Sequence, residues 1–149
     1  EVQHEDVMPI VLACLNMGKQ KEGALIVIER HTGLKEIIRT GELIDADINQ
    51  RLIENIFFKN SPLHDGAMII SKQRITAAGC ILPVSHNNDI PRSLGLRHRA
   101  ALGMTQQSDC LAIVVSEETG RISVAEDGHF HLKLTAEELE RILTEAWIA

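Results

Sequence analysis

The chain has 149 residues, a hydrophobic content of 44% and a formal net charge of −6. That length allows one domain with a sizeable core. The acidic charge is the opposite of the basic surface of nucleic-acid-binding domains, and with no Tyr, one Trp and three Phe the sequence shows no aromatic platform for single strands. Cys14, Cys80 and Cys110 are odd in number and widely spaced, which argues against a disulfide framework or a zinc pair and favours a reducing compartment.

The first half of the chain predicts two helices with a strand between them. Apolar residues at helical spacing predict a helix over residues 5–17. GALIVIE, residues 23–29, is too short and too rich in β-branched residues for a helix, so it predicts a central strand. Helical spacing returns at Ile48 and predicts a second helix that ends near residue 60, with Asp45 or Asp47 as its N-cap.

The middle of the chain predicts a hairpin, a long loop and a short helix. Residues 67–70 and 75–82 are apolar runs that flank a polar turn, which is typical of two paired strands. Residues 84–95 contain Ser, His, Asn, Asp, Pro and Gly in quick succession and predict a loop long enough to carry function. LRHRAALGM, residues 96–104, then predicts a helix.

The last third alternates strand with turn. Residues 111–116, 121–125 and 130–134 predict strands, with an Asp-Gly hairpin turn before the last of them. Thr135 and Glu138 form a capping box that predicts a final helix to about Trp147. Together these elements predict a single α/β domain, in which helices flank both faces of a mixed central β-sheet.

Ionisable residues stand at the start of the strand predicted at 67–70. His64 and Asp65 offer ligands for a metal or a base, and Gly66 lets the backbone pass close to a ligand. An ordinary turn, in which Asp caps and Gly relaxes the bend, is the alternative.

Cations open the helix predicted at 96–104. Arg97, His98 and Arg99 lie beside free backbone N–H groups, where an anion such as phosphate is favoured. A solvated basic tripeptide is the alternative, and His98 is equally compatible with a packed residue. The SEETG turn, residues 116–120, adds a hydroxyl and two carboxylates, although this composition is also ordinary in hairpins.

Other functional templates are missing from the sequence. It has no GxxxxGK[ST] loop, no GxGxxG after the first strand, no HExxH and no GxSxG. The remaining histidines lack paired ligand spacing, and most of them are expected at the surface. They are His4, His31, His86, His129 and His131.

Six segments, in this order, resemble the diadenylate cyclase domain: GALIVIE, TGL, SPLHDGA, AAGCILPVS, LGLRHRAALG and VVSEETGRISVA. The resemblance covers about residues 20–127, and it implies that residues 1–149 are one catalytic domain. It also implies that two ATP molecules condense into cyclic 3′,5′-di-AMP with release of two pyrophosphates. A divalent metal, Mg²⁺, Mn²⁺ or Co²⁺, is implied as the cofactor.

The same resemblance implies roles for individual residues. Asp65, in the catalytic tripeptide Asp65-Gly66-Ala67, would help to activate the ribose 3′-hydroxyl, and His64 and Asp65 would bind the metal. The residues implied to contact ATP are Thr32, Gly33, Leu34, Gly79, Cys80, Ile81, Leu82, Leu96, Arg97, His98, Arg99, Ser116 and Glu118. The chain departs from the family at Ile81, where relatives often carry an aromatic residue, and at Leu96, where they carry a hydroxyl.

The cyclic product also implies a homodimer, because two bound ATP molecules must face each other across a two-fold axis. The apolar stretches are too short to cross a bilayer and no secretion signal is present, so this chain is expected in the cytoplasm. The resemblance is to a membrane-anchored class, which implies an upstream anchor in a longer protein. Two other functions stay open: a non-catalytic nucleotide sensor and a metal-dependent phosphohydrolase.

Overall fold

A computed structural model of the chain describes residues 4–84 and 94–147. Most of the predicted loop 84–95, including His86, lies outside these residues. Among the other histidines expected at the surface, His31, His129 and His131 are exposed. None of the helices in the described ranges has the length and the apolar run that a membrane crossing needs.

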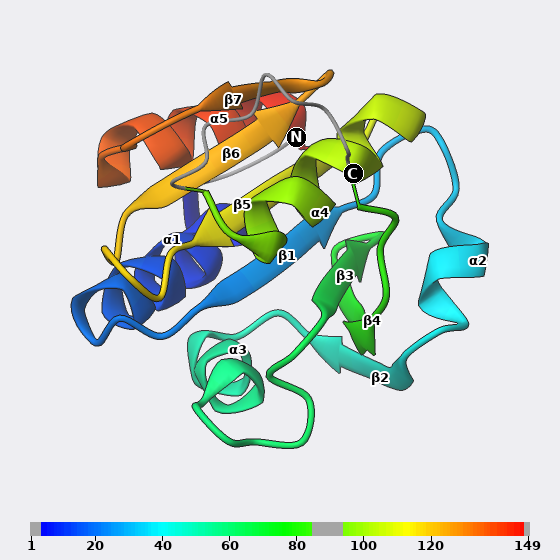
Figure 1. Cartoon of the computed structure of the whole chain (residues 1–149), viewed down its shortest axis with the longest axis horizontal. Coiled ribbons are helices and arrows are strands. Elements are labelled where there is room, and N and C mark those ends of the chain that lie inside the picture. The colour runs from blue at the N-terminus through cyan, green and yellow to red at the C-terminus, as the bar shows by residue number, and fades with distance from the viewer. Residues whose placement is uncertain (1–3, 85–93, 148–149) are drawn as a thin grey trace.

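Within the described residues, seven strands form one mixed sheet in the order β2-β4-β3-β1-β5-β6-β7 (Figure 1). Their bounds are β1 Ala24–Ile28, β2 Glu42–Asp47, β3 Ala67–Ser71, β4 Arg74–Cys80, β5 Leu111–Val115, β6 Ile122–Glu126 and β7 His129–His131. The pair β1 and β3 is parallel, and the other neighbours are antiparallel. The prediction of a central strand at 23–29 is confirmed, because β1 is the middle strand of the sheet.

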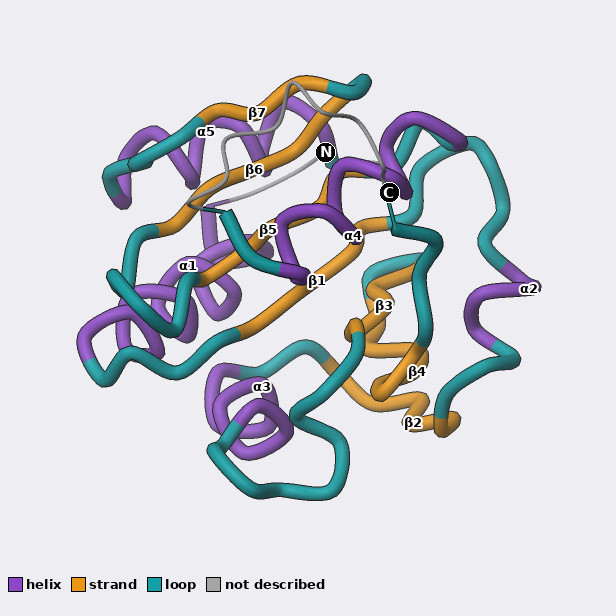
Figure 2. The backbone as a smooth tube through the Cα atoms, in the orientation of Figure 1, coloured by secondary structure: helices purple, strands orange, loops and turns teal. Residues whose placement is uncertain are grey.

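The described part of the chain has five helices, of which α2 lies beside the sheet and the others lie over its two faces (Figure 2). The five are α1 His4–Lys19, α2 Lys35–Ile38, α3 Gln50–Phe57, α4 Leu96–Gln107 and α5 Ala136–Ala146. Every residue of β1 is buried, and successive side chains point to opposite faces. Ala24, Ile26 and Ile28 join the core beneath α1, α3 and α5, whereas Leu25 and Val27 join the core beneath α4 and α2. The predicted α/β class is therefore confirmed.

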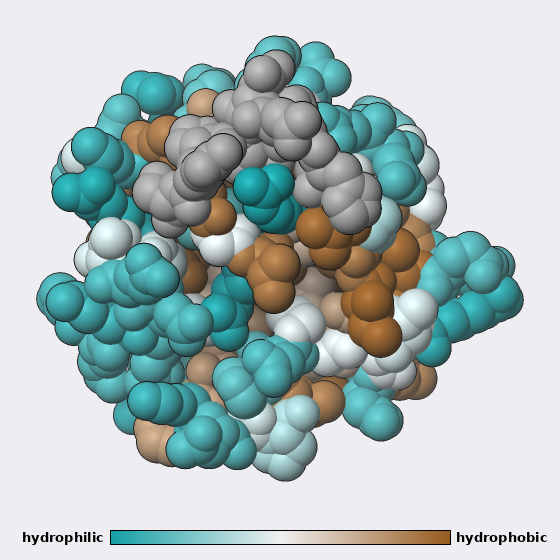
Figure 3. Space-filling model, in the orientation of Figure 1, coloured by the Kyte–Doolittle hydropathy of each residue, from teal (hydrophilic) through white to brown (hydrophobic). Residues whose placement is uncertain are grey.

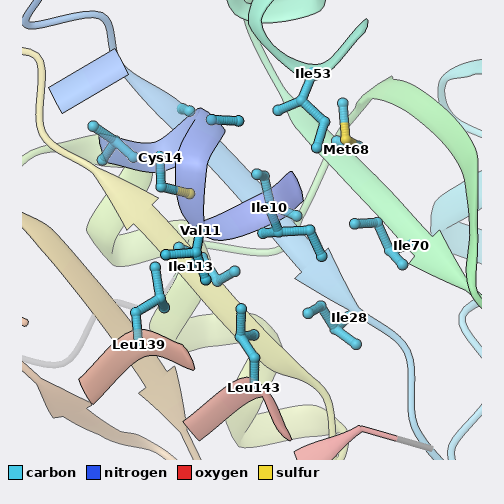
Figure 4. Packing of buried hydrophobic residues seen from close by; sticks show 14 of the residues in the cluster. Ile10, Val11, Cys14, Ile28, Ile53, Met68, Ile70, Ile113, Leu139 and Leu143 are labelled. Carbon is cyan, nitrogen blue, oxygen red and sulfur yellow. The ribbon is translucent and has the colours of Figure 1, made fainter. Parts of the chain in front are cut away.

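Aliphatic side chains fill the larger of the two cores. Ile10 and Val11 of α1 lie against Ile113 of β5 and Leu139 of α5 (Figure 4). Cys14 is fully buried in the same cluster, and burial raises the pKa of its thiol to about 12, so it stays protonated. This core packs the sheet against α1, α3 and α5, whereas α4 lies on the opposite face.

Two local signals in the sequence are confirmed in the last third of the chain. Asp127 and Gly128 join β6 to β7 with φ of 52° and 77°, as a type I′ hairpin turn requires. The Thr135 hydroxyl accepts a hydrogen bond from the Glu138 N–H, and the Glu138 carboxylate accepts one from the Thr135 N–H, which completes the predicted capping box of α5.

The prediction that Asp45 or Asp47 caps the second helix is wrong. Both residues belong to β2, an edge strand that the sequence pattern did not reveal. Arg74 of β4 pairs with both carboxylates at 2.8 Å. Asn49 caps α3 instead, because its side-chain oxygen accepts a hydrogen bond of 2.8 Å from the Leu52 N–H.

Further boundaries differ from the prediction. The strand predicted at 130–134 is β7, which ends at His131. The strand predicted at 75–82 ends at Cys80, so Ile81 and Leu82 follow it as irregular backbone. The helix predicted at 96–104 continues as α4 to Gln107. Only the difference at the end of β4 bears on the site, since the segment that follows β4 forms one of its walls.

Candidate active site

A cleft of about 630 Å³ lies between the start of α4 and one end of the central strands of the sheet. Its volume is typical of sites for small molecules, which range from about 300 to 1,000 Å³. In Figure 3, hydrophobic residues gather in the middle of the face that carries α4, and hydrophilic residues surround them. The lining consists of Leu25, His64, Asp65, Gly66, Cys80, Ile81, Leu82, Val84, Gly95, Leu96, Arg97, His98, Ala100, Val115, Ser116, Glu117 and Glu118.

Strand register brings the polar residues of this cleft together at one end of the central strands. The parallel pairing of Ile26 with Met68 places the segment before β1 beside the segment before β3, which contains Asp65. The antiparallel pairing of Ala24 with Val115 places Ser116, which follows β5, at the same end. Residues far apart in the sequence therefore meet because the starts of β1 and β3 lie next to the end of β5.

Two glycines allow the sharp entry into β3 that positions Asp65. Gly66 has φ of +96°, and a Cβ on it would lie 2.8 Å from the carbonyl oxygen of Cys80. Gly79, on the paired strand, has φ of +65° and faces Leu63. Other residues would be strained in both conformations, and a side chain at Gly66 would also press on the backbone of β4. Asp65 lies immediately before this bend, and its side chain is 86% exposed at the mouth of the cleft.

His64 is oriented by its own backbone neighbourhood. Its Nδ1 lies 2.7 Å from the carbonyl oxygen of Ser61, which can only accept a hydrogen bond. Nδ1 therefore carries the proton, and a neutral ring presents the lone pair of Nε2, which lies 3.4 Å from Oδ1 of Asp65. The imidazole and the carboxylate point to one place.

Arg97 projects from the first turn of α4 into the same place. Its Nη2 lies 3.9 Å from Oδ1 of Asp65, and its Nη1 lies 3.5 Å from Oε1 of Glu117. The Arg97 side chain is only 21% exposed, and its Nε is a fully buried donor without a hydrogen-bond partner in the described residues. A cation in the first turn opposes the helix dipole, so this guanidinium is well placed to meet an anion that enters the cleft.

The start of α4 adds backbone donors. Gly95 is the N-cap residue, and its carbonyl accepts the first intrahelical hydrogen bond from the Arg99 N–H. The N–H groups of the first turn have no acceptor within the helix, and Gly95 offers no side chain to cap them. Such open donors at a helix start, next to a cation such as Arg97, favour a bound anion.

The SEETG turn supplies a hydroxyl with a free proton. The Oγ of Ser116 accepts hydrogen bonds of 3.2 Å from the N–H groups of Glu118 and Thr119. Because both of these bonds use oxygen lone pairs, the Ser116 O–H remains available to donate. Glu117 and Glu118 are exposed at this rim of the cleft.

His98 and Arg99 lie differently from Arg97 around the start of α4. His98 is 6% exposed, and its ring meets that of Phe130 edge to face at 6.0 Å. Burial and the neighbouring Arg97 lower the pKa of His98, so it is neutral near pH 7 and acts as part of the cleft wall. Arg99 is half-buried and lies outside the lining.

The Thr32-Gly33-Leu34 segment also lies outside the lining. The Asp109 carboxylate accepts hydrogen bonds from the His31 and Thr32 N–H groups at 3.0 and 2.9 Å. Burial works against ionisation of Asp109, but these bonds outweigh it and lower the pKa of the carboxyl. Leu34 is buried in the core beneath the cleft, so this segment supports the site from behind.

Apolar residues form the opposite wall. Cys80 and Leu82 are buried, and Ile81 is 69% exposed at the rim. Burial raises the pKa of Cys80 to about 11, so its thiol is a packing group and no nucleophile at neutral pH. Ala67 and Gly79, which were also predicted for the site, do not line the cleft.

Sequence reasoning missed part of the lining. Leu25, Val84, Gly95, Ala100, Val115 and Glu117 were not predicted. Glu117 stands between two predicted residues, so the turn itself was the available signal. Leu25 and Val115 are ordinary strand residues, and only their pairing across the sheet places them here.

The donor set fits a divalent cation that is shared with a ligand. Within the described ranges, three or more His, Cys, Asp or Glu residues never come together to hold a metal. His64 Nε2 and Asp65 Oδ1 nevertheless form a converging pair. Mg²⁺ is commonly held by one or two protein ligands together with substrate phosphates, and a preset imidazole tautomer suits this arrangement.

A family model described as "DAC: DisA bacterial checkpoint controller nucleotide-binding" matches residues 11–130. The chain belongs to this family. It is 46% identical to the cyclic di-AMP synthase CdaA of Bacillus subtilis over 143 residues, which are 96% of this chain and 52% of that protein. It is 43% identical to the diadenylate cyclase of Listeria monocytogenes over 141 residues, 95% of this chain and 52% of that protein.

Solved structures of similar proteins agree with the fold. A double mutant of DacA from Staphylococcus aureus superposes with a TM-score of 0.95 at 44% identity, over 97% of both chains. A hypothetical membrane spanning protein from Bacillus cereus gives a TM-score of 0.84 at 40% identity, over 88% of this chain and 64% of that one. This chain spans about half the length of the curated relatives it matches.

Proposed function

We propose that this chain is a metal-dependent diadenylate cyclase, which condenses two ATP molecules into cyclic 3′,5′-di-AMP and releases two pyrophosphates. The observation that carries the proposal is the meeting of Asp65 and Arg97, 3.9 Å apart, at the polar end of a cleft whose other wall is apolar. Membership of the DAC family, whose relatives include proteins named diadenylate cyclase, supports it. Residues 1–149 would act as one catalytic unit, with the core at about 20–127.

The polar end would handle the triphosphate. Arg97 would hold its oxygens through guanidinium hydrogen bonds and would stabilise charge on the departing pyrophosphate. The open N–H groups of α4 and the Ser116 hydroxyl would donate to the same oxygens. His98 is neutral and packed, so its part would be to keep the helix start in place.

Asp65 would accept the proton of an attacking ribose 3′-hydroxyl. A free 3′-hydroxyl is a poor nucleophile at neutral pH, and a carboxylate within hydrogen-bond reach would take its proton as the bond to the α-phosphorus forms. Pyrophosphate then leaves with the electron pair of the broken P–O bond. A divalent ion held by His64 and Asp65 would neutralise phosphate charge when bound.

The apolar wall would receive the adenine. Ile81 and Leu82 on one side and Leu96 on the other offer aliphatic surface without an aromatic ring. Adenine would therefore be held by burial of its faces rather than by stacking on an aromatic side chain. Buried Cys80 would close this wall from behind.

The cyclic product requires a second active site. Each phosphodiester joins the 3′-oxygen of one nucleotide to the α-phosphate of the other, and one cleft holds one ATP. A two-fold dimer with facing clefts would supply both bonds. The Bacillus cereus relative is described as membrane spanning and the curated relatives are longer, which is compatible with the expected membrane anchor and a cytoplasmic catalytic domain.

The decisive test is product formation from ATP with Mg²⁺, Mn²⁺ or Co²⁺, measured by mass spectrometry. We expect a cyclic dinucleotide from the wild type and at least about a hundredfold loss in Asp65→Asn, the usual range when a catalytic base is removed. Because Asp65 is exposed, Asp65→Asn should melt at the wild-type temperature. Asp47→Asn, which changes an exposed carboxylate on β2, is the matched control and should keep full activity.

Other outcomes would assign the chain differently. ATP binding by calorimetry without any dinucleotide, across metals and protein concentrations, would favour a nucleotide sensor. Release of phosphate or AMP would favour a phosphohydrolase. Both results contradict the cyclase proposal.

A further inference from the structure

Gly23 lies directly against the guanidinium of Arg97. A Cβ built on Gly23 would lie 2.5 Å from Nη1, 2.6 Å from Cζ and 3.1 Å from Nε of Arg97. Real Cβ atoms essentially never approach other heavy atoms closer than 3.0 Å, so any side chain at this position overlaps the guanidinium. We propose that Gly23 is a positioning residue that provides the seat of Arg97 and so sets where the phosphate-binding cation stands.

Gly23 is required for space and not for backbone conformation. The described glycines with positive φ are Gly66, Gly79, Gly120 and Gly128, and Gly23 is not among them. Its backbone conformation is therefore open to any L-residue. Gly23 is buried immediately before β1, and the guanidinium occupies the volume that a side chain would fill.

The seat matters because the other constraints on Arg97 are loose. Its two ion pairs span 3.5 Å to Glu117 and 3.9 Å to Asp65, beyond good hydrogen-bond distance, and both carboxylates are largely exposed. Nε has no partner in the described part of the chain. The absence of a side chain at Gly23 is thus what lets the guanidinium lie where it does.

This arrangement also explains how one end of the central strands aligns the reaction. The pairing of Ala24 with Val115 places Gly23 opposite Ser116, and the pairing of Ile26 with Met68 brings Asp65 alongside. Arg97 descends from α4 onto this end. A displaced guanidinium would lose its alignment with Ser116 and Asp65 while keeping its charge in the cleft.

The inference rests on the proposed function, and a double-mutant cycle tests it through ATP affinity. Calorimetry with ATP and Mn²⁺ is run on the wild type, Gly23→Ala, Arg97→Lys and the double variant. We expect Gly23→Ala to weaken ATP binding about tenfold in the wild-type background and less than about twofold in the Arg97→Lys background, because the slender lysine side chain leaves room for the new methyl group. An equal loss of ATP affinity in both backgrounds, or no loss in either, contradicts the proposal that Gly23 positions Arg97.

A second readout follows Arg97 without any nucleotide. The Nε–H cross-peak of Arg97 in a ¹⁵N spectrum is identified by its disappearance in Arg97→Lys. Gly23→Ala should shift this peak while the melting temperature stays close to that of the wild type. An unmoved peak in a folded Gly23→Ala variant overturns the inference even if ATP binding falls.

The two proposals can fail separately. If the wild type binds ATP but forms no dinucleotide, the cyclase proposal is contradicted, and the double-mutant cycle can still be measured. If the wild type makes cyclic dinucleotide and Gly23→Ala binds ATP as tightly as the wild type does, only the proposal for Gly23 is contradicted. A wild type that binds no ATP contradicts both.

Discussion

His98 occupies a position where two effects oppose its protonation. Burial removes water from the imidazole, and the adjacent Arg97 repels a second positive charge, so the pKa of His98 is lowered from its ordinary value of 6.5. The folded state therefore binds a proton at this site less readily than the unfolded state. The contribution of neutral His98 to stability is complete above pH 6.5 and is lost as the pH falls below it.

This sign gives a prediction for acid stability. Between about pH 7.5 and 5.5, across the titration of an unfolded histidine, we expect the melting temperature of the wild type to fall further than that of His98→Gln, whose side chain cannot be protonated. Differential scanning fluorimetry at matched ionic strength measures the difference. Parallel pH profiles for the two proteins would contradict a buried neutral imidazole.

Individual site residues could be predicted only where the chemistry was local. Asp65, Arg97 and Ser116 were expected in one site and line one cleft. Arg99 was expected beside Arg97 because the two are near neighbours in sequence. Side chains at positions i and i+2 of a helix, however, point about 200° apart around its axis. Helical geometry alone could have separated them. The role of Thr32 was not open to such reasoning, because Asp109, far away in the sequence, holds its loop.

At the scale of elements, the start of α3 is a direct test of the corrected cap. Asn49 provides the capping oxygen, while Asp47 forms an exposed ion pair with Arg74. We expect Asn49→Ala to lower the free energy of unfolding by about 1 kcal/mol, as loss of an N-cap usually does. Asp47→Ala should have the smaller effect, and urea denaturation of both variants compares them. A larger loss in Asp47→Ala would restore the cap that the sequence suggested.

Helices and strands could be predicted where burial left a clear hydrophobic pattern in the sequence. The β1 sequence is apolar throughout because both faces of that strand are covered, and the Asp-Gly turn and the capping box are local signals. Strand β2 has no such signal. Its sequence, ELIDAD, alternates exposed and half-buried positions at the edge of the sheet, and its charges read more naturally as a helix cap. Pairing with β4 made it a strand, and that contact is nonlocal.

At the scale of the whole molecule, the order of the strands could not be predicted from local patterns. Each strand could be recognised by itself, but the parallel neighbourhood of β1 and β3 and the antiparallel one of β1 and β5 depend on the complete core. This order creates the site, because it gathers the segments that hold Gly23, Asp65 and Ser116 at one end of the central strands. The fold class was thus predictable from the sequence, whereas the coincidence of these segments was not.

The dimer proposed for catalysis makes a prediction about mixtures of subunits. Wild-type protein is mixed with Asp65→Asn at a fixed total concentration and left to exchange. If both clefts of a dimer must act, cyclic product comes only from dimers with two wild-type subunits, so the rate follows the square of the wild-type fraction. An equal mixture should then run at about a quarter of the undiluted rate, since random pairing makes a quarter of the dimers wild type.

Mixed dimers carry a second signature, because one intact cleft can still form one bond. Asp65 and Arg97 lie 3.9 Å apart in the same subunit, so each wild-type cleft can activate a hydroxyl and hold the phosphate it attacks. A dimer with one Asp65→Asn subunit should therefore release a linear dinucleotide that keeps one triphosphate, visible by mass spectrometry. A rate proportional to the wild-type fraction, with no linear product at any ratio, would mean that each subunit works alone, and facing clefts would be the wrong assembly.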